Sequence, residues 1–211
     1  MGRLLPVLVC TLLALGIACG DRGPRNFGVV EEGELYRSGR LETEVLRDVI
    51  QEYDIKTVVD LGSFDRYPEK QRSNQEAAAE LGATWYGLQM VGDGRANPNG
   101  YVAALRLLSD PANQPALIQC AGGSERTGTA VVLYRHVVQG RRIQPSYEES
   151  FQHGHDADSY RWIAFLADWA DEIGDAYRDG GWIDGLPPIE PLPGQNVRAK
   201  PAASQWVPPD D

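Results

Sequence analysis

Hydrophobic and polar positions follow two periods along the middle of the chain. Short apolar or β-branched runs are typical of strands, and they cover residues 34–39, 56–61, 83–88 and 115–119. Apolar residues spaced three or four positions apart predict helices over residues 42–53, 68–81, 101–108, 127–138, 146–152 and 159–173. Strands thus alternate with helices up to residue 138, and the elements expected after that are helices. The pattern predicts an α/β three-layer sandwich with a small, largely parallel central sheet and helices on both sides.

The beginning of the chain follows neither period. An apolar run from Leu4 to Ala18 comes after Arg3, and it has the length of a signal-peptide core rather than of a membrane span. Small Ala18 directly precedes Cys19, which resembles a bacterial lipobox. We therefore expect an exported lipoprotein that faces the periplasm or the outside of a bacterial membrane, with Cys19 as the site of lipid attachment. An ordinary secretory signal or an uncleaved anchor is the alternative, because Gly16 replaces the usual aliphatic residue of the lipobox.

These boundaries divide the chain into four parts. Residues 1–18 form the expected signal peptide, residues 19–33 a tether, and residues 34–180 the folded domain. Residues 181–211 are rich in proline and glycine and show no periodicity. We expect this last part to be an extended or disordered tail.

Composition and charge narrow the class of protein. The 211 residues are 42% hydrophobic and 24% charged, which is typical of a folded globular protein. The net charge of −10 argues against a broadly basic nucleic-acid surface and gives no general attraction to anionic membranes. Nucleic acid is therefore not an expected partner, and membrane contact is expected only through the lipid anchor.

The three cysteines have different expected fates. Cys10 would leave with the signal peptide and Cys19 would carry lipid, so Cys120 would have no partner for a disulfide. A lone free cysteine in an exported protein is a candidate reactive thiol.

Cys120 opens the stretch with the strongest chemical signal in the chain. It ends an apolar run, and five residues separate it from Arg126, which directly precedes a helix-like segment over residues 127–138. A loop of this length can turn its backbone N–H groups into one hole at the positive end of a helix dipole, where a tetrahedral oxyanion binds and a thiolate is favoured over a thiol. Arg126 can grip two phosphate oxygens with its planar fork of donors. The predicted phosphate-binding residues are Ala121, Gly122, Gly123, Ser124, Glu125 and Arg126.

Cleavage of a phosphate ester by Cys120 requires further groups. The hydroxyl of Thr127 is placed to hydrogen-bond the sulfur and make it a better leaving group. The departing alkoxide or phenoxide needs a proton from a general acid on a separate loop. Asp93, with a glycine on each side in the loop 90–98, is the best candidate, and Asp60 and Asp65 are weaker ones.

The pattern Cys120-x5-Arg126-Thr127-Gly128 resembles the signature of the cysteine-dependent protein phosphatases, in particular the dual-specificity and tyrosine phosphatase-like branch. The resemblance spans residues 35–173. It implies a dual-specificity phosphatase-like fold, a thiolate nucleophile, a phosphate-gripping arginine, a loop aspartate and no metal cofactor. Those roles map onto Cys120, Arg126 and Asp93. The implied reaction is hydrolysis of a phosphorylated protein or a small phosphomonoester through a cysteinyl-phosphate intermediate.

Two residues depart from the expected pattern. Gln119 stands where the family usually has a histidine, which predicts a less acidic thiol and lower activity. Glu125 places a negative charge in the loop, which disfavours inositol polyphosphates and phosphoinositides and favours phosphotyrosine, phosphoserine, phosphothreonine or another monoester. These departures keep open a catalytically weak or inactive phospho-ligand-binding module. A sulfur-transfer or arsenate-reducing enzyme is a weaker alternative, because no second useful cysteine is present.

Two other features have less specific interpretations. The histidines and aspartates of residues 153–158 indicate a polar connection between helices rather than a metal site, because no cysteine and histidine cluster has zinc spacing. Arg37 is either a second anion contact in the cleft or a surface arginine after a strand.

Overall fold

The structure is a computed structural model that describes residues 25–62, 67–155 and 160–199. The predicted signal peptide, the lipid attachment site Cys19, the weaker acid candidate Asp65 and the end of the predicted tail lie outside the described residues. In the part of the chain that is described, no helix is both long enough and apolar enough to cross a membrane.

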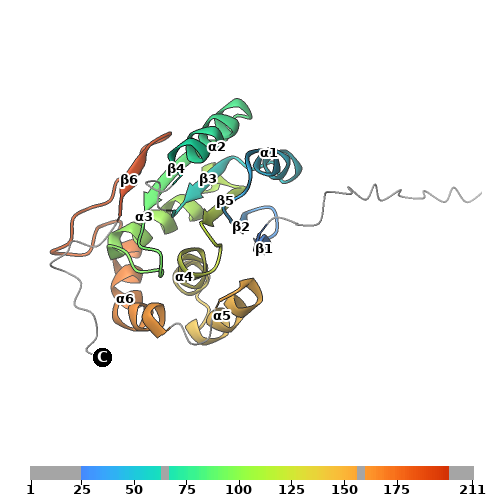
Figure 1. Cartoon of the computed structure of the whole chain (residues 1–211). Helices are drawn as coiled ribbons and strands as arrows, with labels where there is room; N and C mark the ends of the chain where they lie inside the picture. Colours follow the sequence, from blue (N-terminus) through green and yellow to red (C-terminus); the bar gives the residue numbers. More distant parts are fainter. Residues whose placement is uncertain (1–24, 63–66, 156–159, 200–211) are drawn as a thin grey trace, which may run out of the picture.

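Six strands form one sheet at the centre of the molecule (Figure 1). Their order is β1-β2-β5-β3-β4-β6. Only β1 runs antiparallel to its neighbour, and the other pairs are parallel. The strands are β1 (Gly28–Glu31), β2 (Leu35–Gly39), β3 (Thr57–Asp60), β4 (Thr84–Gln89), β5 (Ala116–Cys120) and β6 (Asn196–Arg198).

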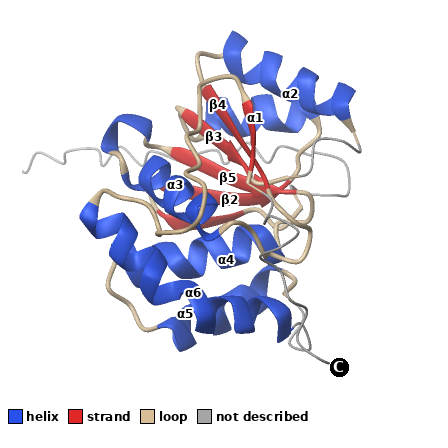
Figure 2. Cartoon of the chain, turned by 90° about the vertical axis from the view of Figure 1, so that its left-hand side faces the viewer, coloured by secondary structure: helices blue, strands red, loops and turns tan. Residues whose placement is uncertain are grey.

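Helices cover both faces of this sheet, which confirms the predicted α/β three-layer sandwich (Figure 2). On one face lie α1 (Thr43–Glu52) and α2 (Pro68–Glu80). On the other lie α3 (Pro98–Ser109), α4 (Glu125–Leu133), α5 (Ile143–Ser150) and α6 (Tyr160–Asp179). The predicted helix over residues 127–138 corresponds to α4 and a π-helical turn at Tyr134–Val138 that continues it.

Each face of the sheet has its own hydrophobic core. Side chains alternate along a strand, so Leu117 and Ile118 of β5 point to opposite sides. Leu117 packs in one core with Leu46 of α1 and Ala78 of α2, whereas Ile118 packs in the other with Leu105 of α3. Because β5 is buried on both sides, its apolar residues 116–118 follow one another instead of alternating with polar ones.

The two outer strands correct the predicted ends of the domain. β1 lies in residues expected to form a tether, and β6 lies in residues expected to form an extended or disordered tail. Each covers an edge of the sheet, because β1 pairs with β2 and β6 pairs with β4. An uncovered edge would leave a row of backbone N–H and C=O groups without partners. Residues 28–31 and 196–198 therefore belong to the sheet, as strands too short for a periodicity to be recognised.

Residues 180–199, here called the C-terminal strap, also fix the loop before α3. The side chains of Asn97 and Asn99 donate to the carbonyl oxygen of Pro187 at 3.0 Å and 3.1 Å. The backbone N–H of Asn97 donates to the carbonyl oxygen of Ala199 at 2.9 Å. The strap thus holds the end of the loop that contains Asp93.

Candidate active site

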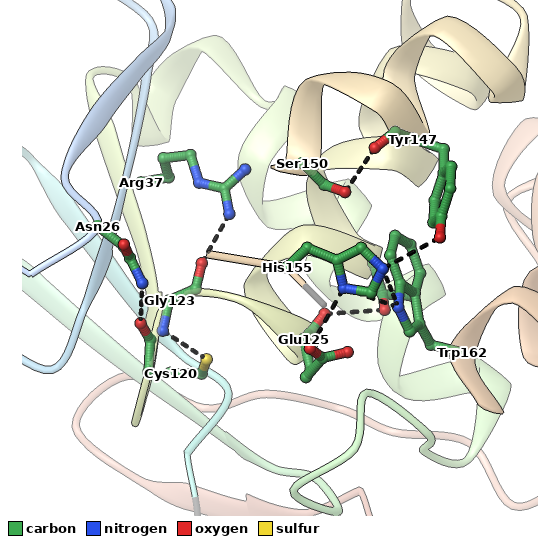
Figure 3. A network of polar contacts seen from close by, with 11 residues as sticks. Asn26, Arg37, Cys120, Gly123, Glu125, Tyr147, Ser150, His155 and Trp162 are labelled. Carbon is green, nitrogen blue, oxygen red and sulfur yellow. Dashed lines mark hydrogen bonds and ion pairs between the residues drawn. The ribbon is translucent and has the colours of Figure 1, made fainter. Parts of the chain in front are cut away.

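Cys120 lies at the carboxyl end of β5, between the ends of β2 and β3. Gly39 is its register partner on β2, and Asp60 of β3 is paired with the preceding Gln119. In parallel sheets ligands bind at this edge of the strands. The thiol is only 2% exposed, and the backbone N–H of Gly123 donates to its Sγ at 3.2 Å (Figure 3).

Contacts from outside the loop orient the backbone of residues 121–123. The N–H of Arg40 donates to the carbonyl oxygen of Ala121 at 3.3 Å, and Nδ2 of Asn26 donates to that of Gly122 at 2.7 Å. Nη2 of Arg37 donates to the carbonyl oxygen of Gly123 at 2.6 Å (Figure 3). In a trans peptide the N–H points away from the C=O. Outward carbonyls therefore turn the next N–H groups toward the sulfur side, as the bond from Gly123 to Sγ shows.

Arg126 stands in the first turn of α4, where helix N–H groups have no partner within the helix. Its side chain is nearly buried, at 5% exposure, and Nη1 donates to the carbonyl oxygen of Leu61 at 3.3 Å. Its Nε is buried and has no hydrogen-bond partner among the described residues. The guanidinium therefore keeps a donor for a ligand, and the positive end of the helix dipole adds to its charge.

Arg37 is not a surface arginine, because it is 1% exposed and lies behind the loop. Burial lowers the pKa of Arg37 to about 10, and the charge of Cys120 acts in the opposite direction. Its Nε and Nη1 have no hydrogen-bond partner among the described residues. The side chain thus places a desolvated positive charge within electrostatic range of the sulfur, while it supports the carbonyl of Gly123.

The loop of the predicted general acid packs against the start of α4. A Cβ added to Gly94 would lie 2.8 Å from Oγ1 of Thr129 and 3.4 Å from the carbonyl oxygen of Glu125. The adjacent Asp93 is half-buried, and its Oδ2 accepts from Nε of Arg95 at 2.8 Å. Arg161 approaches the same oxygen at 3.9 Å. The structure therefore brings Asp93 to the side of the phosphate loop and holds its carboxylate against two arginines.

Thr127 is fully buried, and its Oγ1 has no hydrogen-bond partner among the described residues. The hydrogen bond to the sulfur comes from the N–H of Gly123 instead. A role for the hydroxyl during the reaction therefore stays a prediction.

Gln119 and Asp60 form a buried pair under the loop. Nε2 of Gln119 donates to Oδ2 of Asp60 at 3.1 Å, and the N–H of Gly62 donates to Oδ1 at 2.6 Å. Nη2 of Arg40 lies 3.7 Å from the same carboxylate. Burial raises the pKa of Asp60, opposed by Arg40, the N–H of Gly62 and Gln119. Because Asp60 is fully buried, we assign it to positioning the end of β5 and not to protonating a leaving group.

Asp60→Asn is expected to change how the free energy of unfolding varies with pH. Because the pKa of Asp60 is raised in the folded protein, its protonated carboxyl favours the folded state. This contribution to the free energy of unfolding is complete below the pKa of an unfolded aspartate, about 3.9, and it is lost as the pH rises through the folded-state pKa. The wild-type protein should therefore lose stability relative to Asp60→Asn from about pH 4 upward, measured by chemical denaturation. The prediction concerns this slope and not the absolute stability, since the variant also replaces the carboxyl group that contacts Arg40.

Asp48→Asn, which removes an exposed carboxylate on α1, is the matched control for the change in charge. It should keep the pH slope of the wild type. Parallel slopes for the wild type and Asp60→Asn would contradict the raised pKa.

Glu125 belongs to a cluster that the sequence did not indicate. Its Oε1 lies 3.2 Å from Nδ1 of His155, whose Nε2 lies 3.2 Å from the hydroxyl of Tyr147 (Figure 3). The indole N–H of Trp162 approaches the imidazole ring, with Nε1 3.0 Å from both ring nitrogens. His155 is buried, at 7% exposure. The charge of Glu125 is thus held toward α5 and α6 by a residue thirty positions away, and no local pattern connects the two.

No group of three or more histidine, cysteine, aspartate or glutamate side chains suited to a metal ion occurs within residues 25–62, 67–155 and 160–199.

Comparison with known proteins places this geometry in a family. Residues 20–153, more than half of the 211-residue chain, match the model of the tyrosine phosphatase family. The core catalytic domain of the PP-IP phosphatase SIW14 from S. cerevisiae is 25% identical, with 78% of this chain and 98% of that chain covered and a TM-score of 0.60. TpbA from P. aeruginosa is 24% identical, with 73% and 91% covered and a TM-score of 0.59, and another of its structures is a complex with pTyr.

The comparison with curated proteins finds no match. The match to the family model includes the loop from Cys120 to Arg126 as well as the strands on either side of it. The chain therefore belongs to the tyrosine phosphatase family.

Proposed function

We propose that the chain hydrolyses phosphomonoesters through a cysteinyl-phosphate intermediate. The observation that carries this proposal is the orientation of the loop backbone. Outward carbonyl contacts turn N–H groups toward Sγ of Cys120, beside a guanidinium that keeps a free donor. A tetrahedral phosphate fits such a nest.

In the first step Sγ of Cys120 attacks phosphorus as the ester oxygen leaves. Arg126 and the loop N–H groups stabilise the charge that develops on the phosphoryl oxygens. Asp93 gives its proton to the departing oxygen, so the leaving group departs as an alcohol or phenol. In the second step Asp93 takes a proton from water, the water oxygen attacks phosphorus, and the sulfur leaves as a thiolate. The products are inorganic phosphate and the starting enzyme.

The substrate class remains wider than the sequence suggested. Glu125 alone predicted that densely charged phosphates would be disfavoured. Its contact with His155 weakens that prediction, because the carboxylate is held away from the centre of the loop. The similar S. cerevisiae protein is described as a PP-IP phosphatase, and the P. aeruginosa protein has been crystallised with pTyr. We propose phosphotyrosine and other phosphomonoesters as substrates, including those that carry further phosphate groups.

The test of the function is hydrolysis of an aryl phosphate combined with acid quenching during turnover. We expect release of inorganic phosphate, and mass spectrometry should find one phosphoryl group on the peptide that contains Cys120. Turnover with the phosphoryl group on another residue would overturn the mechanism. Phosphate binding without turnover would support the phospho-ligand-binding alternative, for which Gln119 is the motivating residue.

Asp93→Asn is expected to slow the reaction in a way that depends on the leaving group. General acid catalysis contributes about a hundredfold to ten-thousandfold, and it matters most when the leaving oxygen is strongly basic. The variant should therefore lose about a hundredfold in kcat/KM, which reports formation of the cysteinyl-phosphate, with phenyl phosphate and much less with p-nitrophenyl phosphate. Glu125→Gln is the comparison, because it neutralises the carboxylate within the loop itself. If Glu125→Gln showed the leaving-group dependence and Asp93→Asn did not, the assignment of Asp93 would be wrong.

We also propose that the protein is exported and anchored by lipid on Cys19, from the apolar run and the small residue before that cysteine. Fractionation of bacteria that express the full chain tests this. Cys19→Ser should move the protein from the membrane fraction to the soluble fraction, and an unchanged membrane fraction would overturn lipid anchoring.

A further inference from the structure

The segment before β1 is fixed against the outer side of the phosphate loop. The N–H of Gly39 donates to the carbonyl oxygen of Arg25 at 2.6 Å, and Nδ2 of Asn26 donates to the carbonyl oxygen of Gly122 at 2.7 Å. Asn26 has a positive φ of 52°, which asparagine tolerates better than most residues. Two hydrogen bonds and a turn thus hold the backbone of residues 25–26 beside the loop.

The guanidinium of Arg25 lies at the rim of the phosphate loop. A Cβ added to Gly122 would be 3.8 Å from Nη2 of Arg25, in van der Waals contact. Arg25 is exposed, and within the described ranges it has no hydrogen bond or ion pair through its side chain. The other arginines around the loop differ in this respect. Arg37, Arg40 and Arg126 are nearly buried and contact the loop or its supporting strands.

We infer that Arg25 is a substrate-positioning residue that binds a second anionic group, a phosphate or a carboxylate, next to the phosphate held by the loop. The inference rests on the proposed function and deepens it by naming the class of substrate. Arginine binds phosphate and carboxylate through two parallel hydrogen bonds, so an unpaired guanidinium at the rim can select for such a group. Gly122 has no side chain, so a ligand that extends past this residue would come next to the guanidinium of Arg25.

The net charge of the whole protein has the opposite sign to the charge of Arg25. With a net charge of −10, the surface as a whole repels a ligand that carries several negative charges. An exposed arginine at the rim adds attraction at one place and leaves the rest of the surface repulsive. A second anionic group would therefore gain affinity where it can reach Arg25.

Direct binding of inorganic phosphate and inorganic pyrophosphate to the full chain tests the inference without turnover. Pyrophosphate presents a second phosphoryl group one bridging oxygen away from the first. We expect the wild type to bind pyrophosphate more tightly than phosphate in calorimetric titrations. Arg25→Ala should weaken pyrophosphate binding about tenfold and phosphate binding less than about twofold, with partial recovery in Arg25→Lys. The hydrogen bond that Arg25 accepts from Gly39 uses its backbone, so these variants keep it.

Arg178→Ala is the matched control, since it removes the same charge from an exposed position at the far end of α6. It should bind both anions as the wild type does. The inference is overturned if the wild type shows no preference for pyrophosphate. It is also overturned if Arg25→Ala weakens both anions equally or neither, or if Arg178→Ala reproduces its effect. Failure of the catalytic mechanism would appear separately, as the absence of a phosphoryl group on Cys120 during turnover.

Discussion

Cys120→Ser is expected to abolish hydrolysis of aryl phosphates while inorganic phosphate still binds. Serine keeps an atom that can accept the N–H of Gly123, so the loop should hold its shape. Its hydroxyl is a far weaker nucleophile than the thiolate that the loop favours. Loss of the nucleophile from an enzyme with a covalent intermediate typically costs about a thousandfold or more in kcat, and we expect a loss of that size.

Steady-state kinetics and phosphate titration of the same preparation separate the two effects. Arg126→Lys is a useful comparison, because it keeps a positive charge but loses the planar fork that can hold two phosphate oxygens. We expect that variant to weaken both phosphate binding and turnover, whereas Cys120→Ser should affect turnover alone. Undiminished activity in Cys120→Ser would exclude a cysteinyl-phosphate mechanism.

The loop could be predicted from sequence because its determinants are local. Cys120, Arg126 and the glycines between them are near neighbours in the chain, and the apolar run before them identifies the strand that positions the sulfur. The alternation of strand and helix patterns likewise predicted the layers, since each element buries a stripe that can be recognised within ten or fifteen residues.

The supporting contacts could not be predicted because they join distant residues. Arg37 lies 86 positions from Gly123, and whether it is buried behind the loop or exposed depends on the packing of β2 against β5. The contact between Glu125 and His155 depends on how the segment after α5 folds back toward the loop. The edge strands β1 and β6 were missed for a related reason, because they are too short to show a period and gain their stability by pairing with β2 and β4.

The two glycines of the loop have different roles that the sequence does not distinguish. Gly122 and Gly123 are adjacent and were expected to serve the same purpose, but the structure distinguishes them. Gly123 has a positive φ of 76°, and an added Cβ would overlap the backbone nitrogen of Gly39 and lie 2.7 Å from the carbonyl carbon of Ser38. Gly122 is not among the residues with positive φ, and its added Cβ would meet only Oγ of Ser124 at 3.6 Å and Nη2 of Arg25 at 3.8 Å.

Gly123→Ala is therefore expected to damage both stability and activity, while Gly122→Ala should be tolerated. A left-handed backbone costs a residue with a Cβ roughly 1–2 kcal/mol. The overlap adds to this cost, because the atoms in the way belong to β2 and cannot move without disturbing its pairing with β5. The loop N–H that binds Sγ belongs to Gly123 itself. A displacement of about 1 Å at such a position can reduce the rate about a hundredfold, and we expect kcat/KM to fall by at least that factor.

Chemical denaturation, phosphate titration and steady-state kinetics of the two alanine variants provide the measurement. For Gly122→Ala we expect an unfolding free energy within about 0.5 kcal/mol of the wild type, the usual range for a substitution that creates no clash. For Gly123→Ala we expect weaker phosphate binding as well as lower stability, because the strained residue carries the N–H group that faces the sulfur. Equal effects in the two variants would show that the loop adapts to a side chain at either position. In that case the close approach of Gly123 to β2 would not be what shapes the phosphate nest.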